Sequence, residues 1–171
     1  MSASETWVAQ REDLAVEALR RTGRLRLQVR GESMLPALWP GDVAEIADCS
    51  LNDLRHGEVV LASQEGRFYL HRFLSRRDPD GFLTRGDSMP HPDPVFPAEA
   101  LLGRLVGISR AAKTASAPMP LRPWSRALGF VFCFCSPVRR LALKLHRRRT
   151  TARADKLHAG NLTSDLGSPQ I

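Results

Sequence analysis

Three side chains that together could activate a serine nucleophile occur in this chain: Ser33, His71 and Asp93. A serine hydroxyl is a weak nucleophile at neutral pH, and it needs a base within hydrogen-bonding reach. His71 is the best candidate for that base, because it lies between apolar residues in a predicted strand while its neighbour Arg72 would point to the opposite face. Asp93 would orient the imidazole and stabilise the imidazolium ion. This combination predicts acyl-transfer chemistry.

Each of these residues also has a structural interpretation. Ser33 could be a turn or cap serine, and His71 could be packed for structural reasons alone. Gly86-Asp87 could orient the imidazole, support the site, or form a turn in which the aspartate caps its own backbone. We favour Asp93 as the orienting acid and Asp87 as a supporting residue. Met34 would line a substrate cleft or belong to the core. The backbone N–H of Ser33 is the natural donor to an oxyanion.

The residues before Ser33 indicate how the chain would position it. Apolar residues in the range 4–22 recur at near-helical spacing, and Gly23 stands where a helix would end. Arg24 to Arg30 then alternates strictly between polar and apolar residues, which is typical of a half-buried strand. A helix followed by a strand therefore leads directly to the candidate nucleophile.

The middle of the chain reads as a series of short strands separated by turns that contain glycine or proline. The predicted strands are 42–46, 57–62, 67–74, 82–84 and 101–108. The 57–62 and 67–74 strands would pair across a turn at 64–66. Short strands at this density predict a mainly β protein with a compact, partly closed, barrel-like sheet.

The C-terminal third differs in charge from the rest of the chain. Residues 1–109 hold 13 Lys/Arg and 16 Asp/Glu, whereas residues 110–171 hold 12 Lys/Arg and 2 Asp/Glu. We predict an N-terminal helix over 1–23 and a catalytic β domain over 24–110. Beyond these we predict a linker over 111–123, a helix over 124–149 with a break at Ser136-Pro137, and a disordered tail over 150–171.

The predicted helix over 124–149 is basic and amphipathic. Such a helix suits a peripheral membrane surface, where each Lys or Arg near anionic lipid contributes about 1 kcal/mol. It could instead pack on the β domain or on a partner with its charges solvated. Binding to nucleic acid is the least favoured interpretation, because a basic run without base-reading residues is only an electrostatic footprint.

Other features narrow the class of protein. The three cysteines, Cys49, Cys133 and Cys135, have neither redox nor zinc-site spacing, so we expect free thiols in a reducing compartment, no disulfide, no metal and no cofactor. Charged residues interrupt the first 30 positions, and the longest apolar run is about half the ~20 residues that a membrane-spanning helix needs. We therefore expect no signal peptide or anchor, and a cytoplasmic or peripheral inner-membrane location.

Four motifs resemble a known family. They are Gly-Glu-Ser-Met-Leu-Pro at 31–36, His-Arg-Phe at 71–73, Phe-Leu-Thr-Arg-Gly-Asp at 82–87 with Asp93 six residues later, and Leu-Gly-Arg-Leu-Val-Gly at 102–107. Their types and order are similar to the boxes of the signal peptidase I and SOS-repressor peptidase clan, over about residues 25–109. The histidine followed by arginine is similar to the endoplasmic-reticulum and archaeal branch, since the usual bacterial enzymes have lysine there.

The resemblance implies a serine endopeptidase with Ser33 as nucleophile, His71 as base and Asp93 as acid, acting on an exported precursor or on a leader peptide. The chain departs from the family in having the charged segment 4–22 in place of a transmembrane anchor, and Ser88 where asparagine usually follows Gly-Asp. One alternative is an inactive module that binds a peptide or protein at a membrane surface. A DNA-associated regulator is disfavoured, because no helix-turn-helix precedes the first strand.

Overall fold

A computed structural model describes the positions of 14–77, 79, 81–110, 113–116, 129, 131–133, 135 and 137–146. The chain divides into two units, Met1–Phe134 and Cys135–Ile171, which are described separately below. The first unit holds the sheet and all the candidate site residues.

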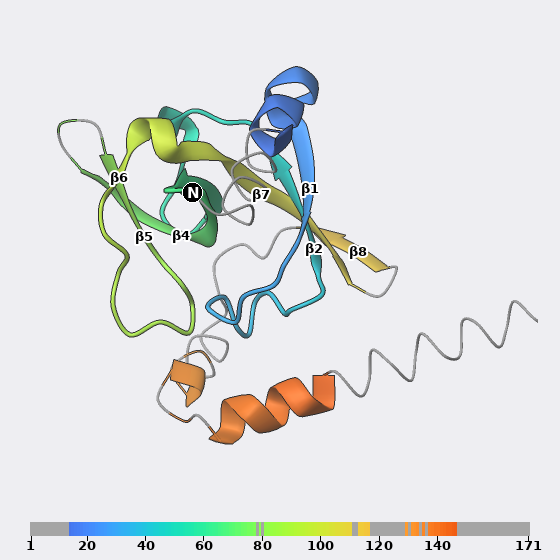
Figure 1. Cartoon of the computed structure of the whole chain (residues 1–171). Helices are drawn as coiled ribbons and strands as arrows, with labels where there is room; N and C mark the ends of the chain where they lie inside the picture. Colours follow the sequence, from blue (N-terminus) through green and yellow to red (C-terminus); the bar gives the residue numbers. More distant parts are fainter. Residues whose placement is uncertain are drawn as a thin grey trace, which may run out of the picture. The chain divides into compact units, whose positions relative to one another are not determined.

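The first unit is mainly β, as the sequence predicts, and its strands form one antiparallel eight-stranded sheet (Figure 1). The strands are β1 (Arg24–Gln28), β2 (Val43–Ala47), β3 (Val59–Gln64), β4 (Arg67–Arg77), β5 (Gly81–Arg85), β6 (Phe96–Pro97), β7 (Leu101–Arg110) and β8 (Lys113–Ser116). Short 3-10 helices, η1 (Leu51–Asp53) and η2 (Ala98–Ala100), precede β3 and β7.

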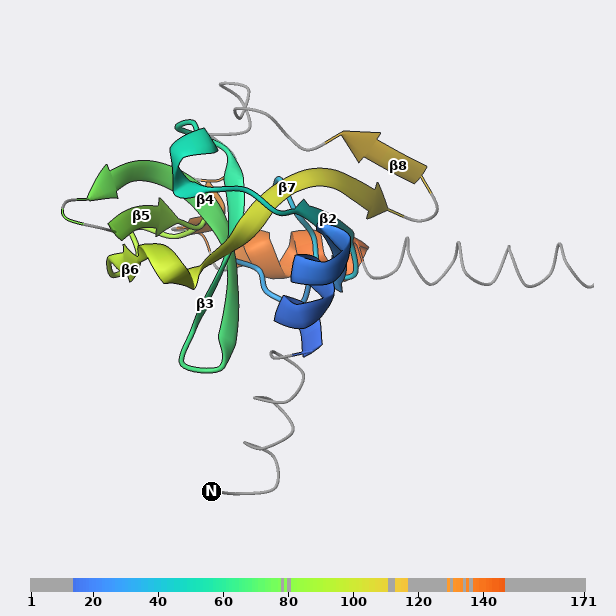
Figure 2. The same ribbon diagram turned by 90° about the horizontal axis from the view of Figure 1, so that it is seen from above.

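The order of the strands is β1-β2-β7-β3-β4-β5-β6, with β8 paired to β7. Figure 2 shows β8 beyond the end of β7. Strands β1 and β6 are the two ends of this order, so the sheet does not close into a barrel, and the expectation of a partly closed barrel is wrong in this respect. The end strand β6 consists of Phe96 and Pro97 and pairs only with β5. Two residues, one of them a proline without an N–H group, offer too few backbone groups to extend the sheet.

The hairpin of β3 and β4 places the candidate base. The two strands pair as the sequence predicts, and Gln64 faces Arg67 across a two-residue turn. Both turn residues, Glu65 and Gly66, have positive φ angles of 53° and 74°. Turns of this hand match the right-handed twist of the strands and so fix their register. In that register His71 stands opposite Val60.

Successive residues of β3 belong to two different hydrophobic clusters. Leu61 packs in one cluster with Leu19 of the helical segment 14–22, whereas Val60 and Ala62 pack in the other. This division follows from the alternation of side chains along a strand. In the second cluster Phe82 and Phe96 stack with their ring centroids 5.5 Å apart. The helical segment and the β5–β6 hairpin thus cover opposite faces of the same strand.

The structure describes only parts of the predicted helices. Residues 14–22 are helical, while the predicted start of that helix at residue 4 lies outside the described residues. Residues 129 and 131–133 are helical, and so are residues 137–146, in agreement with a break near Pro137. None of the described helices is both long enough and apolar enough to cross a membrane. The predicted tail, 150–171, also lies outside the described residues.

The predicted linker over 111–123 contains a strand. Lys113–Ser116 forms β8 and pairs with the end of β7, where Arg110 faces Lys113. The Ala- and Ser-rich composition concealed this strand, because its pairing comes from a hairpin with β7 rather than from an alternating pattern of its own.

A buried ion pair joins the end of β7 to the loop that follows Ser33. Asp42 is 1% exposed, and its carboxylate accepts two hydrogen bonds from Arg110, at 2.7 and 2.5 Å. It also accepts one from the backbone N–H of Trp39 at 2.8 Å. The hydrogen bonds from Arg110 to Asp42 raise the pKa of the guanidinium above its ordinary value, so Arg110 stays charged. The pair thereby fixes the far end of the loop that begins at Ser33.

We expect Arg110→Ala to lower the free energy of unfolding by about 2 kcal/mol, because it leaves the Asp42 carboxylate buried without its cation. The value lies below that for a fully buried pair, since the Arg110 side chain is 45% exposed. Arg24→Ala, which removes the exposed partner of Glu45, is the matched control and should cost no more than about 0.5 kcal/mol. Urea denaturation measures both values, and equal losses would contradict the role of the buried pair.

Candidate active site

Ser33 lies in the tight turn that follows β1. The segment Glu32–Ala37 turns on itself through backbone hydrogen bonds, among them Leu35 N–H to the Glu32 carbonyl at 3.2 Å. Leu35 and Leu38 are fully buried, which fixes the turn to the core. Ser33 itself is half-buried, so its hydroxyl remains accessible at the surface of this turn.

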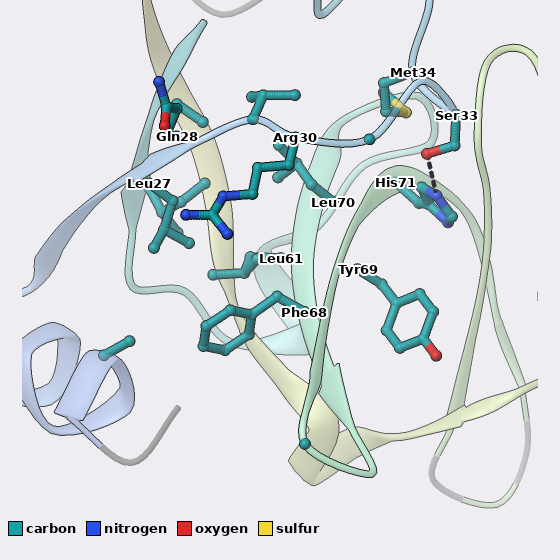
Figure 3. A pocket seen from close by; sticks show the side chains of 16 residues that line it. Leu27, Gln28, Arg30, Ser33, Met34, Leu61, Phe68, Tyr69, Leu70 and His71 are labelled. Atoms are coloured by element: carbon teal, nitrogen blue, oxygen red, sulfur yellow. Dashed lines mark hydrogen bonds between the residues drawn. The ribbon is translucent and has the colours of Figure 1, made fainter. Parts of the chain in front are cut away.

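The structure brings Ser33, His71 and Asp93 into one chain of hydrogen bonds. The Oγ of Ser33 lies 2.8 Å from Nε2 of His71, and Nδ1 of His71 lies 2.7 Å from Oδ2 of Asp93 (Figure 3 shows the serine–histidine contact). An ionised carboxylate can only accept hydrogen bonds. With Asp93 ionised, Nδ1 therefore carries the ring proton, and Nε2 accepts the hydroxyl proton of Ser33.

Asp93 is fixed by a residue that the sequence analysis did not single out. The hydroxyl of Thr84 donates to Oδ2 of Asp93 at 2.6 Å, and the backbone N–H of Asp93 donates to the Thr84 carbonyl at 2.9 Å. Thr84 is 1% exposed and belongs to β5. The sequence signal that could have identified Thr84 is its position inside the Phe-Leu-Thr-Arg-Gly-Asp motif at 82–87. Thr84 thus positions the carboxylate that in turn positions the imidazole.

Asp87 does not touch His71. Its two carboxylate oxygens accept hydrogen bonds from Nε and Nη2 of Arg72, both at 2.7 Å. Arg72 also donates through Nη1 to the carbonyl of Gly57. Both side chains of the pair are nearly buried. Asp87 is therefore a supporting residue in the structural sense, since it binds the loop after β5 to β4 on the face opposite His71.

Gly86 and Ser88 hold that loop against the turn that carries Ser33. The Ser88 hydroxyl donates to the Glu32 carbonyl at 2.8 Å, and the Ser88 N–H donates to the Ser33 carbonyl at 2.9 Å. At Gly86 an added Cβ would lie 2.6 Å from the carbonyl oxygen of Ser33. Only glycine permits this approach of the two backbones. Ser88, the departure from the family pattern, therefore makes two of the contacts that fix the nucleophile.

The helical residues 129 and 131–133 pack on the same two loops. At Gly129 an added Cβ would lie 2.8 Å from the carbonyl oxygen of Asp87. Phe132 is 3% exposed and makes an edge-to-face contact with Trp39, with 6.3 Å between ring centroids. The apolar run that the sequence analysis assigned to an amphipathic helix thus covers the site loops in part.

A cavity of about 670 Å³ opens beside the Ser33–His71 pair (Figure 3). Its lining comes from the helical segment 14–22, from β1 and the segment after it, from β2 and β3, and from the β3–β4 turn with the first half of β4. Met34 is 2% exposed, packs in the core and also lines this cavity, so both roles that the sequence allowed for it, cleft and core, hold together.

The backbone N–H of Ser33 makes no hydrogen bond within the described part of the chain, so it is free to donate to an oxyanion.

Two other kinds of chemistry find little support in the described residues. No group of three or more His, Cys, Asp or Glu side chains among them could hold a metal ion. Burial raises the pKa of the Cys49 thiol to about 11, so this cysteine is protonated and unreactive at neutral pH.

No family model matches this chain, and no curated protein matches it at a significant level. The resemblance to signal peptidases therefore rests on the four short sequence motifs.

We expect Gly86→Ala to displace the turn that carries Ser33, because the added methyl group would meet the carbonyl oxygen of Ser33 as well as the side chain of Met89, and the carbonyl can move only with the backbone. Overpacking of this kind costs about 1–3 kcal/mol of unfolding free energy. Gly31→Ala is the control, since its Cβ would meet nothing closer than the Ser33 hydroxyl at 3.9 Å. Denaturant titration measures the loss, and a crystal structure of each variant measures the distance between Ser33 Oγ and His71 Nε2. An unchanged distance in Gly86→Ala would contradict the prediction.

Proposed function

We propose that this protein is a serine endopeptidase of the signal-peptidase type, which cleaves a precursor or leader peptide. The observation that carries the proposal is the continuous hydrogen-bond chain from Ser33 through His71 to Asp93, opening on a cavity. Nucleophile, base and orienting acid in such a chain are what an activated serine requires.

In the proposed reaction Ser33 Oγ attacks the carbonyl carbon of the scissile peptide bond while its proton passes to His71 Nε2. The backbone N–H of Ser33 stabilises the oxyanion of the tetrahedral intermediate. His71 then donates the proton to the leaving amine, which yields the acyl-enzyme. Water activated by the same imidazole attacks the ester and releases the second product. Asp93 stabilises the imidazolium ion in both steps.

The sheet offers strand edges along which an extended peptide could bind. Strand β1 ends the sheet and pairs only with β2, within the described residues. On β4, the pairing with β5 begins at Arg72, so the five residues before it pair only with β3 in that part of the structure. Both stretches line the cavity. A peptide that adds a strand here would gain backbone hydrogen bonds and place its side chains alternately in the cavity.

We expect Ser33→Ala and His71→Ala each to lower kcat at least about a thousandfold, because either change removes the activated nucleophile. The measurement is turnover of a mixed peptide library, read by mass spectrometry, with and without lipid vesicles. His56→Ala is the histidine control, since its ring bonds to the Leu74 carbonyl outside the cavity. If the wild-type chain cleaves nothing under either condition, the alternative of an inactive peptide-binding module replaces this proposal.

We further propose that the helix 137–146 contacts a membrane surface. Val138, Leu141 and Leu145 are 42%, 59% and 47% exposed. Their spacing of three and four residues places them on one face of the helix. Arg140 and Lys144, both exposed, flank that face. An exposed apolar face bordered by cations suits the interface of an anionic bilayer.

We expect the full chain to sediment with vesicles of phosphatidylcholine and phosphatidylglycerol, and much less with phosphatidylcholine alone. Leu141→Ser should weaken this binding about tenfold, because the leucine side chain no longer enters the bilayer interface. Leu14→Ser, at another exposed leucine on a helix of the first unit, is the matched control. Equal binding to both kinds of vesicle, or equal effects of the two substitutions, would contradict a role for this helix.

A further inference from the structure

The cavity beside Ser33 is unusual in the charge of its lining. Its walls are largely apolar, and its lining residues include no aspartate or glutamate. Apart from His71, the single ionisable cation among them is Arg30. Arg30 is solvent-exposed, and a peptide bound against the apolar walls would displace part of the water that screens its charge. An opposite charge on that peptide would then interact with Arg30 more strongly than in open solvent.

Arg30 lies two residues beyond the end of β1 and differs from the arginines of that strand in having no partner within the described residues. Arg24 bonds to Glu45 at 2.6 Å, and Arg26 bonds to the hydroxyl of Ser109 at 3.4 Å. Arg30 makes no hydrogen bond or ion pair within the described residues, and Figure 3 shows its side chain pointing into the cavity. Its guanidinium is thus available to a group that enters the cavity.

We propose that Arg30 selects peptides that carry an aspartate or glutamate near the scissile bond. This inference rests on the proposed peptidase function and names the substrate class for the same site. The guanidinium group presents a planar fork of donors that fits a carboxylate, and it repels a lysine or arginine side chain. The specificity would therefore come from one ion pair added to an otherwise apolar contact surface.

The position of Arg30 limits where the acidic residue lies. Arg30 precedes Ser33 by three residues, and both residues line the same cavity. Three residues of chain span at most about 10 Å. The carboxylate that meets Arg30 therefore belongs to a residue within a few positions of the bond that Ser33 attacks.

The test uses the full-length chain and a positional library of fluorescein-labelled octapeptides in which one position at a time is Glu, Gln or Lys. Binding is measured by anisotropy on the Ser33→Ala protein, so that it does not depend on cleavage. At one position we expect Glu to bind about fivefold or more tightly than Gln, as for a partly desolvated carboxylate–arginine contact. Arg30→Gln should remove this preference, and Arg30→Glu should reverse it in favour of Lys.

Arg26→Gln is the matched control, because Arg26 lies in β1, four residues before Arg30, and does not line the cavity. It should keep the preference for Glu. If the Arg30→Gln protein prefers Glu as strongly as its parent does, or if no position favours Glu, the inference is overturned. A chain that binds acidic peptides through Arg30 but cleaves none would retain this inference and overturn the peptidase proposal.

Discussion

Two neighbouring residues of β4, His71 and Arg72, each bind a carboxylate of the same loop. Because side chains alternate along a strand, His71 reaches Asp93 on one face while Arg72 reaches Asp87 on the other. The loop between Asp87 and Asp93 is therefore attached to β4 at both of its ends. Without Arg72, the Asp87 carboxylate would be nearly buried and unpaired, a state that costs several kcal/mol. The geometry of the acid–base pair follows from this double attachment.

The nucleophile is positioned through the same loop. Ser88 donates hydrogen bonds to the carbonyl oxygens of both Glu32 and Ser33, and Gly86 lets the two backbone segments approach closely. At its other end, the turn that carries Ser33 is fixed by the buried pair of Asp42 and Arg110. Ser33 thus lies between two attachment points, the hydrogen bonds to Ser88 and the ion pair of Asp42 with Arg110. Such rigidity keeps the hydroxyl within hydrogen-bonding distance of the imidazole, and preorganisation of this kind is what acyl transfer requires.

The cavity, rather than the hydrogen-bonded residues, would decide which peptides are accepted. Its apolar walls would contact many different apolar side chains equally well. The unpaired strand edges would form backbone hydrogen bonds with a peptide of any sequence. A single unpaired arginine in that setting is the group that distinguishes one side chain from another. The basic helix 137–146 bears on a different question, because an exposed apolar face beside cations concerns the location of the protein and not the proposed selection of peptides.

The sequence by itself determined the local features: alternation predicted β1, glycine-containing turns predicted the β3–β4 hairpin, and the motifs named Ser33, His71 and Asp93. These features are visible because strand periodicity and turn chemistry depend on residues only a few positions apart. The tertiary structure decided what depends on distant contacts. In the folded sheet β7 lies between β2 and β3, Lys113–Ser116 is a strand, and the sheet stays open. Asp87 pairs with Arg72 and not with His71. Partners such as Asp42 and Arg110 are 68 residues apart, and no local pattern records which distant groups will meet.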